Sequence, residues 1–287
     1  MQNTTEIDPN AMDVDDNRNF TLTPSPPPPP IESIYWVSPP SAAEASSTGV
    51  YGLYGDSDGL WVTYNWKKDS PDARIEPFYN RWPPSRTSSR WCSWISVNCG
   101  LSPSIQNLPS EELEKRFRRD VVGLKTEFDA IRAKGGQVTP EMIDALAIKY
   151  GVLSGKWMVY SKPEAVDQLW RKIVRVVAFD RGYGQVKVSA RKVLDSNEHG
   201  AQEQEGGVPV PDEGHVTCVY VEDYTNRQEV DELRKALRFR ASVFWKIGFK
   251  PDVYTYLGIY KGNEWGLRPS RYHDSDNDTG GYRRSHQ

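Results

Sequence analysis

The spacing of apolar residues predicts two amphipathic helices in the second half of the chain. Apolar positions recur at helical spacing after Pro163 and again after Asn226. The segments 161–164 (Ser-Lys-Pro-Glu) and 225–228 (Thr-Asn-Arg-Gln) each fit a capping box, in which two side chains close the first turn of a helix. The predicted core positions are Val166, Leu169, Trp170, Ile173 and Val177 on the first helix, and Val230, Leu233 and Leu237 on the second.

Earlier in the chain the same spacing predicts two more helices. The first carries Leu113, Phe117, Leu124, Phe128 and Ile131, with Ser110 as its N-cap and Gly135-Gly136 as its end. The second begins at Thr139-Pro140-Glu141, with proline at the first helical position, and ends at Gly151.

Alternation of apolar and polar residues predicts strands between these helices. Segment 185–192 alternates strictly, with Val186, Val188 and Ala190 on one face and Lys187, Ser189 and Arg191 on the other. The other expected strands are 61–64, 91–97, 156–160, 215–221 and 254–260, with a loop over 81–90 and a turn over 261–264.

This mixed order of helices and strands, without internal repeats, favours an α+β fold with one sheet face covered by helices. Nine of the 21 prolines lie in the first 40 residues, so we expect residues 1–50 to form a disordered, acidic and proline-rich arm. A single domain should span 51–273, interrupted by a flexible acidic loop at 195–214 and followed by a disordered tail at 274–287.

Composition limits the class of protein. The chain of 287 residues is 37% hydrophobic and 26% charged, enough to form a core. No apolar run approaches the ~18 residues of a membrane span, and residues 1–20 lack the pattern of a signal peptide. Three cysteines cannot build a disulfide framework, so we expect a cytoplasmic or nuclear protein without a membrane segment.

The net charge of -3 is unevenly distributed. Residues 1–30 carry a net charge of -4 and residues 195–214 a net charge of -6, which leaves +7 for the rest of the chain. A basic body beside two acidic segments favours an anionic partner such as RNA or a nucleotide.

The sequence gives little sign of catalysis. The four histidines (His199, His215, His273 and His286) are scattered and show no metal-binding spacing. Cys218 lies within an expected strand, where we expect a buried apolar role. No nucleophile elbow or phosphate-binding loop occurs, so we expect no enzyme, no cofactor and no bound metal.

Aromatic stacking combined with basic groups is the chemistry that fits the residues best. Trp157 and Trp170 lie at core positions, whereas Trp82 lies in an expected loop near three arginines and is the preferred stacking residue. The other candidate rings are Trp61, Trp66, Trp91 and Trp265. We interpret the basic stripe of the helix over 226–240 as a solvated face.

Two longer segments carry a resemblance. Residues 152–157 (Val-Leu-Ser-Gly-Lys-Trp) and 250–260 (Lys-Pro-Asp-Val-Tyr-Thr-Tyr-Leu-Gly-Ile-Tyr), followed by Asn263, Trp265 and Pro269, resemble the basophilic leukemia-expressed protein family. The resemblance covers about residues 60–273. It implies the fold of the translation initiation factor 4E, a curved, mostly antiparallel sheet with helices on its convex back.

The resemblance also bears on the site. That factor holds a methylated guanine between two tryptophans, one followed by a glutamate that reads the base, shortly before a Gly-Gly-Arg-Trp segment that 154–157 resembles. The corresponding stretch here, 143–153, has neither Trp nor Glu, so the likeness does not extend to cap recognition. Basic residues near segment 185–192 would hold phosphates, which makes Lys187, Arg191 and Lys192 candidates.

Two functions remain open. The first is a non-catalytic RNA- or nucleotide-binding protein that uses the concave sheet face, with Trp82, Trp91, Lys187, Arg191 and Lys192 as candidate contacts. The second is a protein-interaction adaptor with a vestigial ligand face. In that case the convex helices or the run Pro26–Pro30, which suits the aromatic grooves of SH3 or WW domains, would dock partners.

Overall fold

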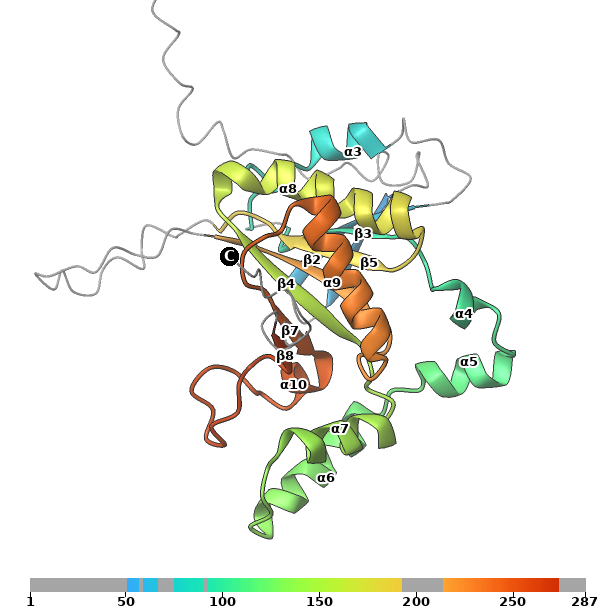
Figure 1. The fold of residues 1–287 in the computed structure, drawn as a ribbon, viewed down its shortest axis with the longest axis vertical. Helices are drawn as coiled ribbons and strands as arrows, with labels where there is room; N and C mark the ends of the chain where they lie inside the picture. Colours follow the sequence, from blue (N-terminus) through green and yellow to red (C-terminus); the bar gives the residue numbers. More distant parts are fainter. Residues whose placement is uncertain (1–50, 57–58, 67–74, 90–91, 193–213, 274–287) are drawn as a thin grey trace, which may run out of the picture. The chain divides into compact units, whose positions relative to one another are not determined.

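The computed structural model describes residues 51–56, 59–66, 75–89, 92–192 and 214–273 (Figure 1). These residues all fall within one unit, Tyr35–Gln287. The expected arm over 1–50, the tail over 274–287 and the acidic loop over 195–214, apart from Gly214, lie outside the described residues.

The strands form an open, curled sheet in the order β1-β2-β3-β5-β6-β4-β7-β8. Only the β2–β3 pair within the described residues is parallel; the other neighbours are antiparallel. The mostly antiparallel sheet that we predicted is therefore confirmed. The strands are β1 Tyr51–Asp56, β2 Gly59–Asn65, β3 Trp94–Asn98, β4 Gly155–Ser161, β5 Gln185–Ser189, β6 His215–Val221, β7 Gly248–Pro251 and β8 Tyr272–His273.

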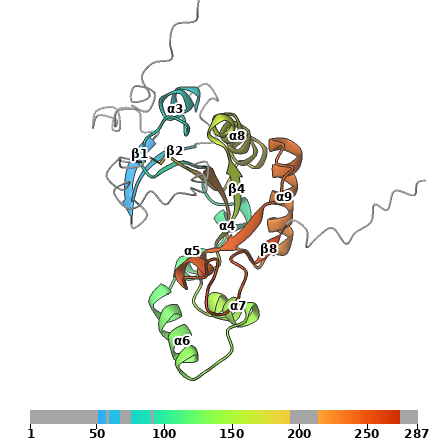
Figure 2. The ribbon, with the colours of Figure 1, turned by 90° about the vertical axis from the view of Figure 1, so that its left-hand side faces the viewer.

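Three helices pack on one face of this sheet. Phe78 of α3 contacts Tyr64 of β2 at a ring-centroid distance of 5.2 Å, and the indole N–H of Trp157 in β4 donates to the carbonyl of Val230 in α9 at 3.0 Å. Figure 2 shows α3, α8 and α9 along the same side of the strands. The helices are α3 Ile75–Arg81, α4 Pro103–Gln106, α5 Ser110–Phe117, α6 Val121–Ala133, α7 Pro140–Lys149, α8 Pro163–Arg175, α9 Arg227–Ala241 and α10 Asp252–Tyr256, with a π-helical turn at Val176–Arg181.

The core between the helices and the sheet follows the predicted pattern. All eight predicted core positions of α8, the turn after it and α9 are buried, as are Trp157 and Trp170. Pro163 begins α8 and has no N–H of its own to leave unpaired, while Asn226 caps α9 by accepting from the backbone N–H of Glu229 at 3.3 Å. No helix within the described residues is long and apolar enough to cross a membrane.

The predicted N-caps of three helices are corrected. Asn226 caps α9 in place of Thr225, and Pro109 precedes α5 in place of Ser110, without a side-chain capping bond. The N-cap of α8 is Lys162 and makes no side-chain capping bond, so Ser161 does not cap that helix as expected, because it still belongs to β4. The expected helix from Ser110 to Ile131 is interrupted, and α5 and α6 are separate helices. The first segment, α5, ends at Phe117, and Asp120 caps α6, since its carboxylate accepts from the backbone N–H of Gly123 at 2.7 Å.

The predicted strand at 254–260 is wrong. Residues 252–256 instead form α10, in which Val253 and Tyr254 are both buried. The backbone N–H of Leu257 donates to the carbonyl of Val253 at 3.0 Å, which closes the helical turn. Aromatic and branched residues raised the strand propensity here, but tertiary burial determined the conformation.

Candidate functional site

The sheet face opposite α3, α8 and α9 carries aromatic and basic side chains; we call it the outer face. The pairing register decides which residues share it, because side chains alternate along every strand. Lys156 is paired with Tyr220 and Lys250, and Lys187 with Ser96 and Cys218. The outer-face residues used below are Trp61, Thr63, Trp94, Ser96, Lys156, Lys187, Cys218, Tyr220 and Lys250.

At the centre of this face, Lys187 lies against two tryptophans. Its Nζ atom is 3.9 Å from the ring centroid of Trp61 and 3.9 Å from that of Trp94. The two indole rings lie 6.1 Å apart between centroids and are tilted by 46°. Only 4% of Lys187 is exposed, so its charge lies in a largely water-excluded setting where each cation–π contact contributes about 1–2 kcal/mol.

Local strand geometry holds these three side chains in place. Trp61 and Trp94 are direct partners in the parallel β2–β3 pair, which brings their rings to the same face. One row further along, Thr63 and Ser96 are hydrogen-bonded through their hydroxyls at 2.6 Å. Both of these hydroxyl residues are buried, so they fix the register beside the rings.

A second basic group lies on β4 and β7. The Lys156 ammonium is 2.6 Å from Oδ1 of Asp252, whose other carboxylate oxygen accepts from the hydroxyl of Ser154 at 2.5 Å. The ammonium of Lys250 instead lies 3.7 Å from the ring centroid of Tyr260. Burial, together with the positive charge of Lys156, lowers the pKa of Lys250 to about 8, although Asp252 partly offsets this.

A polar pocket of about 330 Å³ opens beside this group. Two of its lining residues, Tyr220 and Asp252, are the ring and the carboxylate that contact Lys156. Arg119 and Gln185 line it as well. The pocket therefore offers both hydrogen-bond donors and hydrogen-bond acceptors next to the aromatic and basic outer face.

The structure brings together only part of the predicted site. Lys187 and Trp61 meet on the outer face. Arg191 follows β5 and pairs through its backbone with Thr87 and Ser89, so it anchors that loop. Lys192 is exposed, and Trp91 lies outside the described residues.

Trp82, the preferred stacking residue, does not lie in an exposed loop. It directly follows α3, its backbone N–H donates to the carbonyl of Phe78 at 2.9 Å, and it is 0% exposed. The guanidinium of Arg81 covers its ring at 4.7 Å. Trp82 therefore packs in the core, and we leave it out of the candidate site.

The remaining candidate rings also make internal contacts. Trp66 packs against Phe179 at 4.7 Å between ring centroids, and Trp265 packs edge-on against Phe128 at 5.3 Å. On α9, Arg234 and Lys235 pair with Asp231 of the same helix. Part of the basic stripe is thus paired within its own helix.

Trp94, Lys156 and Lys250 were not among the predicted contacts. Trp94 lies on the same face as Ser96 in the alternating segment 91–97, so the sequence indicates the face of the strand on which its side chain lies. The sequence does not indicate which strand pairs with this one. Lys156 and Lys250 lie in the two segments that carried the resemblance, where an alternating pattern alone does not reveal that they are paired.

The described residues contain no cluster of three or more His, Cys, Asp or Glu that could hold a metal ion. Burial raises the pKa of the Cys92 and Cys99 thiols to about 12, so neither is a thiolate at neutral pH. Cys218 is buried, as expected for an apolar role. The chemistry available on the outer face is thus stacking, cation–π contact and ion pairing.

These features define a mixed α/β protein with an open, curled sheet whose outer face carries an aromatic and basic cluster. The model of the family described as basophilic leukemia-expressed protein Bles03 matches residues 112–258, more than half of the chain. The chain belongs to this family, as the two resembling segments predicted. Lys156, Lys187 and Lys250 lie within the matched residues, whereas Trp61 and Trp94 lie before them.

Proposed function

We propose that this protein is a non-catalytic binder of nucleotides or single-stranded RNA, and that the outer face of its sheet is the binding surface. The observation that carries the proposal is the position of the Lys187 ammonium, 3.9 Å from the ring centroids of both Trp61 and Trp94. One cation and two large aromatic rings are thereby held side by side on three neighbouring strands.

A nucleotide can use both parts of this cluster. A base stacked on an indole ring contributes about 1–3 kcal/mol, and the phosphate provides the negative charge that a lysine prefers to an aromatic ring. Binding would exchange one cation–π contact of Lys187 for an ion pair with phosphate and open a ring face to the base. Lys156 and Lys250 supply further positive charge along the same face.

The fold resemblance supports the proposal without extending it to cap recognition. A mostly antiparallel sheet with helices on one face is compatible with the arrangement in the translation initiation factor 4E, which we propose as the finer description of this fold. Residues 143–153, where that factor places a tryptophan and a glutamate, form most of α7 and the segment that follows it. We therefore propose a general nucleotide ligand that does not need a methylated cap.

Fluorescence anisotropy with the full chain tests the proposal. Labelled single-stranded RNA, capped and uncapped, would be titrated over a series of salt concentrations. We expect salt-dependent binding without cap preference, weakened about tenfold by Trp61→Leu or Lys187→Met, since a lost stack or charge is worth about 1.4 kcal/mol. Lys125→Met removes an exposed lysine of α6 and is the matched control. Absence of binding at low salt would overturn the proposal.

A further inference from the structure

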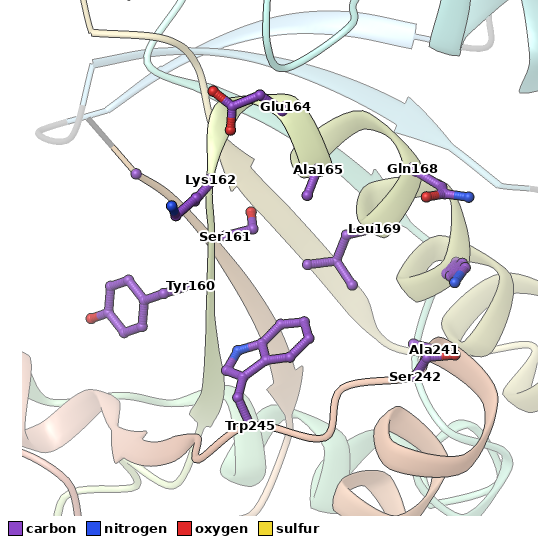
Figure 3. A pocket seen from close by; sticks show the side chains of 12 residues that line it. Tyr160, Ser161, Lys162, Glu164, Ala165, Gln168, Leu169, Ala241, Ser242 and Trp245 are labelled. Carbon is purple, nitrogen blue, oxygen red and sulfur yellow. The ribbon is translucent and has the colours of Figure 1, made fainter. Parts of the chain in front are cut away.

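A groove on the helix side of the molecule lies away from the aromatic and basic cluster. It has a volume of about 610 Å³ and lies between the end of β4, the first half of α8 and the segment that follows α9 (Figure 3). The groove is lined by Tyr160, Ser161, Lys162, Glu164, Ala165, Gln168, Leu169, Lys172, Gly214, Ala241, Ser242 and Trp245.

The floor of the groove is apolar. From α8 it receives Ala165 and Leu169, which lie one turn apart on the same helix face. From the other side it receives Ala241 and Trp245, and Figure 3 shows the Trp245 ring and Leu169 pointing toward one another. Trp245 is 42% exposed, so part of its ring is accessible to a ligand.

The segment that carries Trp245 is held by its neighbours. Ser242 ends α9 in the left-handed conformation at φ 61°, and it is the one residue other than glycine with positive φ among the described residues. The next residue, Val243, is buried and donates its N–H to the carbonyl of Leu237 at 3.2 Å. Trp245 is thus exposed on an anchored turn, which lowers the entropy that a ligand must remove on binding.

The rim of the groove carries excess positive charge. Lys162 and Lys172 stand on it with one carboxylate, Glu164. Neither lysine forms an ion pair with any of the residues that the structure describes. Carboxylates of a ligand could therefore form ion pairs with both lysines at this rim.

We propose that this groove binds a short acidic peptide segment of a partner protein, with an apolar side chain between Leu169 and Trp245 and carboxylates beside Lys162 and Lys172. A concave apolar floor with charges only on its rim suits an extended or helical peptide. This site is independent of the outer face, and its failure would leave the proposed nucleotide binding untouched.

A peptide selection on the full-length protein tests this inference. Random dodecapeptides displayed on phage would be selected on the wild-type chain, and enriched peptides would be synthesised and measured by fluorescence anisotropy. We expect sequences that combine Leu, Phe or Trp with several Asp or Glu. Trp245→Ala, and the charge reversal Lys162→Glu with Lys172→Glu, should each weaken binding at least about tenfold.

Phe239→Ala is the matched control, because Phe239 is an exposed aromatic residue of α9 that does not line the groove. It should leave binding within about twofold, and thermal unfolding would verify that every variant is folded. Enriched peptides that are basic, or that bind the Trp245→Ala variant equally well, would overturn the proposal. So would binding to phosphatidylserine-containing vesicles that is lost in the groove variants while no peptide is enriched.

Discussion

Lys156 and Lys250 are direct neighbours across the β4–β7 pair, yet a carboxylate holds only one of them. The Lys156 ammonium lies 2.6 Å from Asp252, whereas that of Lys250 lies over the Tyr260 ring. Burial and the charge of Lys156 lower the pKa of Lys250 from 10.5 to about 8. At neutral pH Lys250 is therefore charged in the folded protein, and keeping that charge buried costs free energy that the unfolded chain does not lose.

This arrangement predicts a pH-dependent effect of Lys250→Met. Between the folded and unfolded pKa values the unfolded chain binds more protons, so the contribution of Lys250 to stability rises as the pH rises from about 8 to 10.5. Urea denaturation should find the variant more stable than wild type near pH 7, with the advantage shrinking toward about pH 10. An equal stability difference between variant and wild type at both pH values would contradict the lowered pKa of Lys250.

Asp144 of α7 joins two distant parts of the chain. Its carboxylate accepts from the hydroxyl of Tyr224 at 2.8 Å and from Nη2 of Arg271 at 2.9 Å. Because Tyr224 is 0% exposed, Asp144→Ala leaves a buried hydroxyl without its acceptor and should lower the free energy of unfolding by about 2 kcal/mol.

Glu141→Ala provides the matched control for this change. Glu141 contacts the same Arg271 at 3.4 Å but is 73% exposed, so its loss should change the stability by less than about 0.5 kcal/mol. Chemical denaturation of both variants makes the comparison, and similar losses in the two would refute the role given to Asp144.

The backbone conformation of Ser242 predicts that its substitution by glycine stabilises the protein. A side chain at φ 61° is strained, and glycine adopts this conformation without that cost. Ser242→Gly should therefore raise the midpoint of denaturation, corresponding to at most about 1 kcal/mol, while Ser242→Val should lower it. A lower midpoint for the glycine variant would show that the serine side chain contributes more than the strain costs.

Substitutions of Trp82 test whether this residue has the structural role that its burial predicts. Because it is fully buried after α3, Trp82→Ala should lower the free energy of unfolding by about 3–5 kcal/mol, and Trp82→Phe by less. Thermal and denaturant unfolding would measure both. A loss below about 1 kcal/mol for the alanine variant would indicate that the ring is not packed as the structure has it.

The helices of the second half could be predicted because local pattern and tertiary burial agree there. Leu169, Trp170 and Ile173 recur at helical spacing on α8 and are all buried. Local pattern and tertiary structure disagree between Phe117 and Val121, where a continuous apolar pattern is divided into two helices and Asp120 caps the second. They disagree again at Val253 and Tyr254, where strand-forming residues are buried by a helical turn.

The site was less predictable than the fold because it depends on pairing between strands far apart in the sequence. Lys187 was selected from its own alternating strand, and Trp61 from its residue type. Their meeting requires β2, β3 and β5 to lie side by side, including the parallel β2–β3 pair, and no local signal specifies this order. The same limit explains the choice of Trp82, whose burial is set by contacts outside its own segment.

Photo-crosslinking tests most directly whether the outer face is the binding surface. A short single-stranded RNA containing 4-thiouridine would be irradiated with the full chain, and the crosslinked peptides mapped by mass spectrometry. The structure predicts adducts in the peptides that carry Trp61, Trp94 and Lys187, reduced by Lys187→Met but not by Lys125→Met. Adducts confined to α9 or other segments, with none on β2, β3 or β5, would contradict the account.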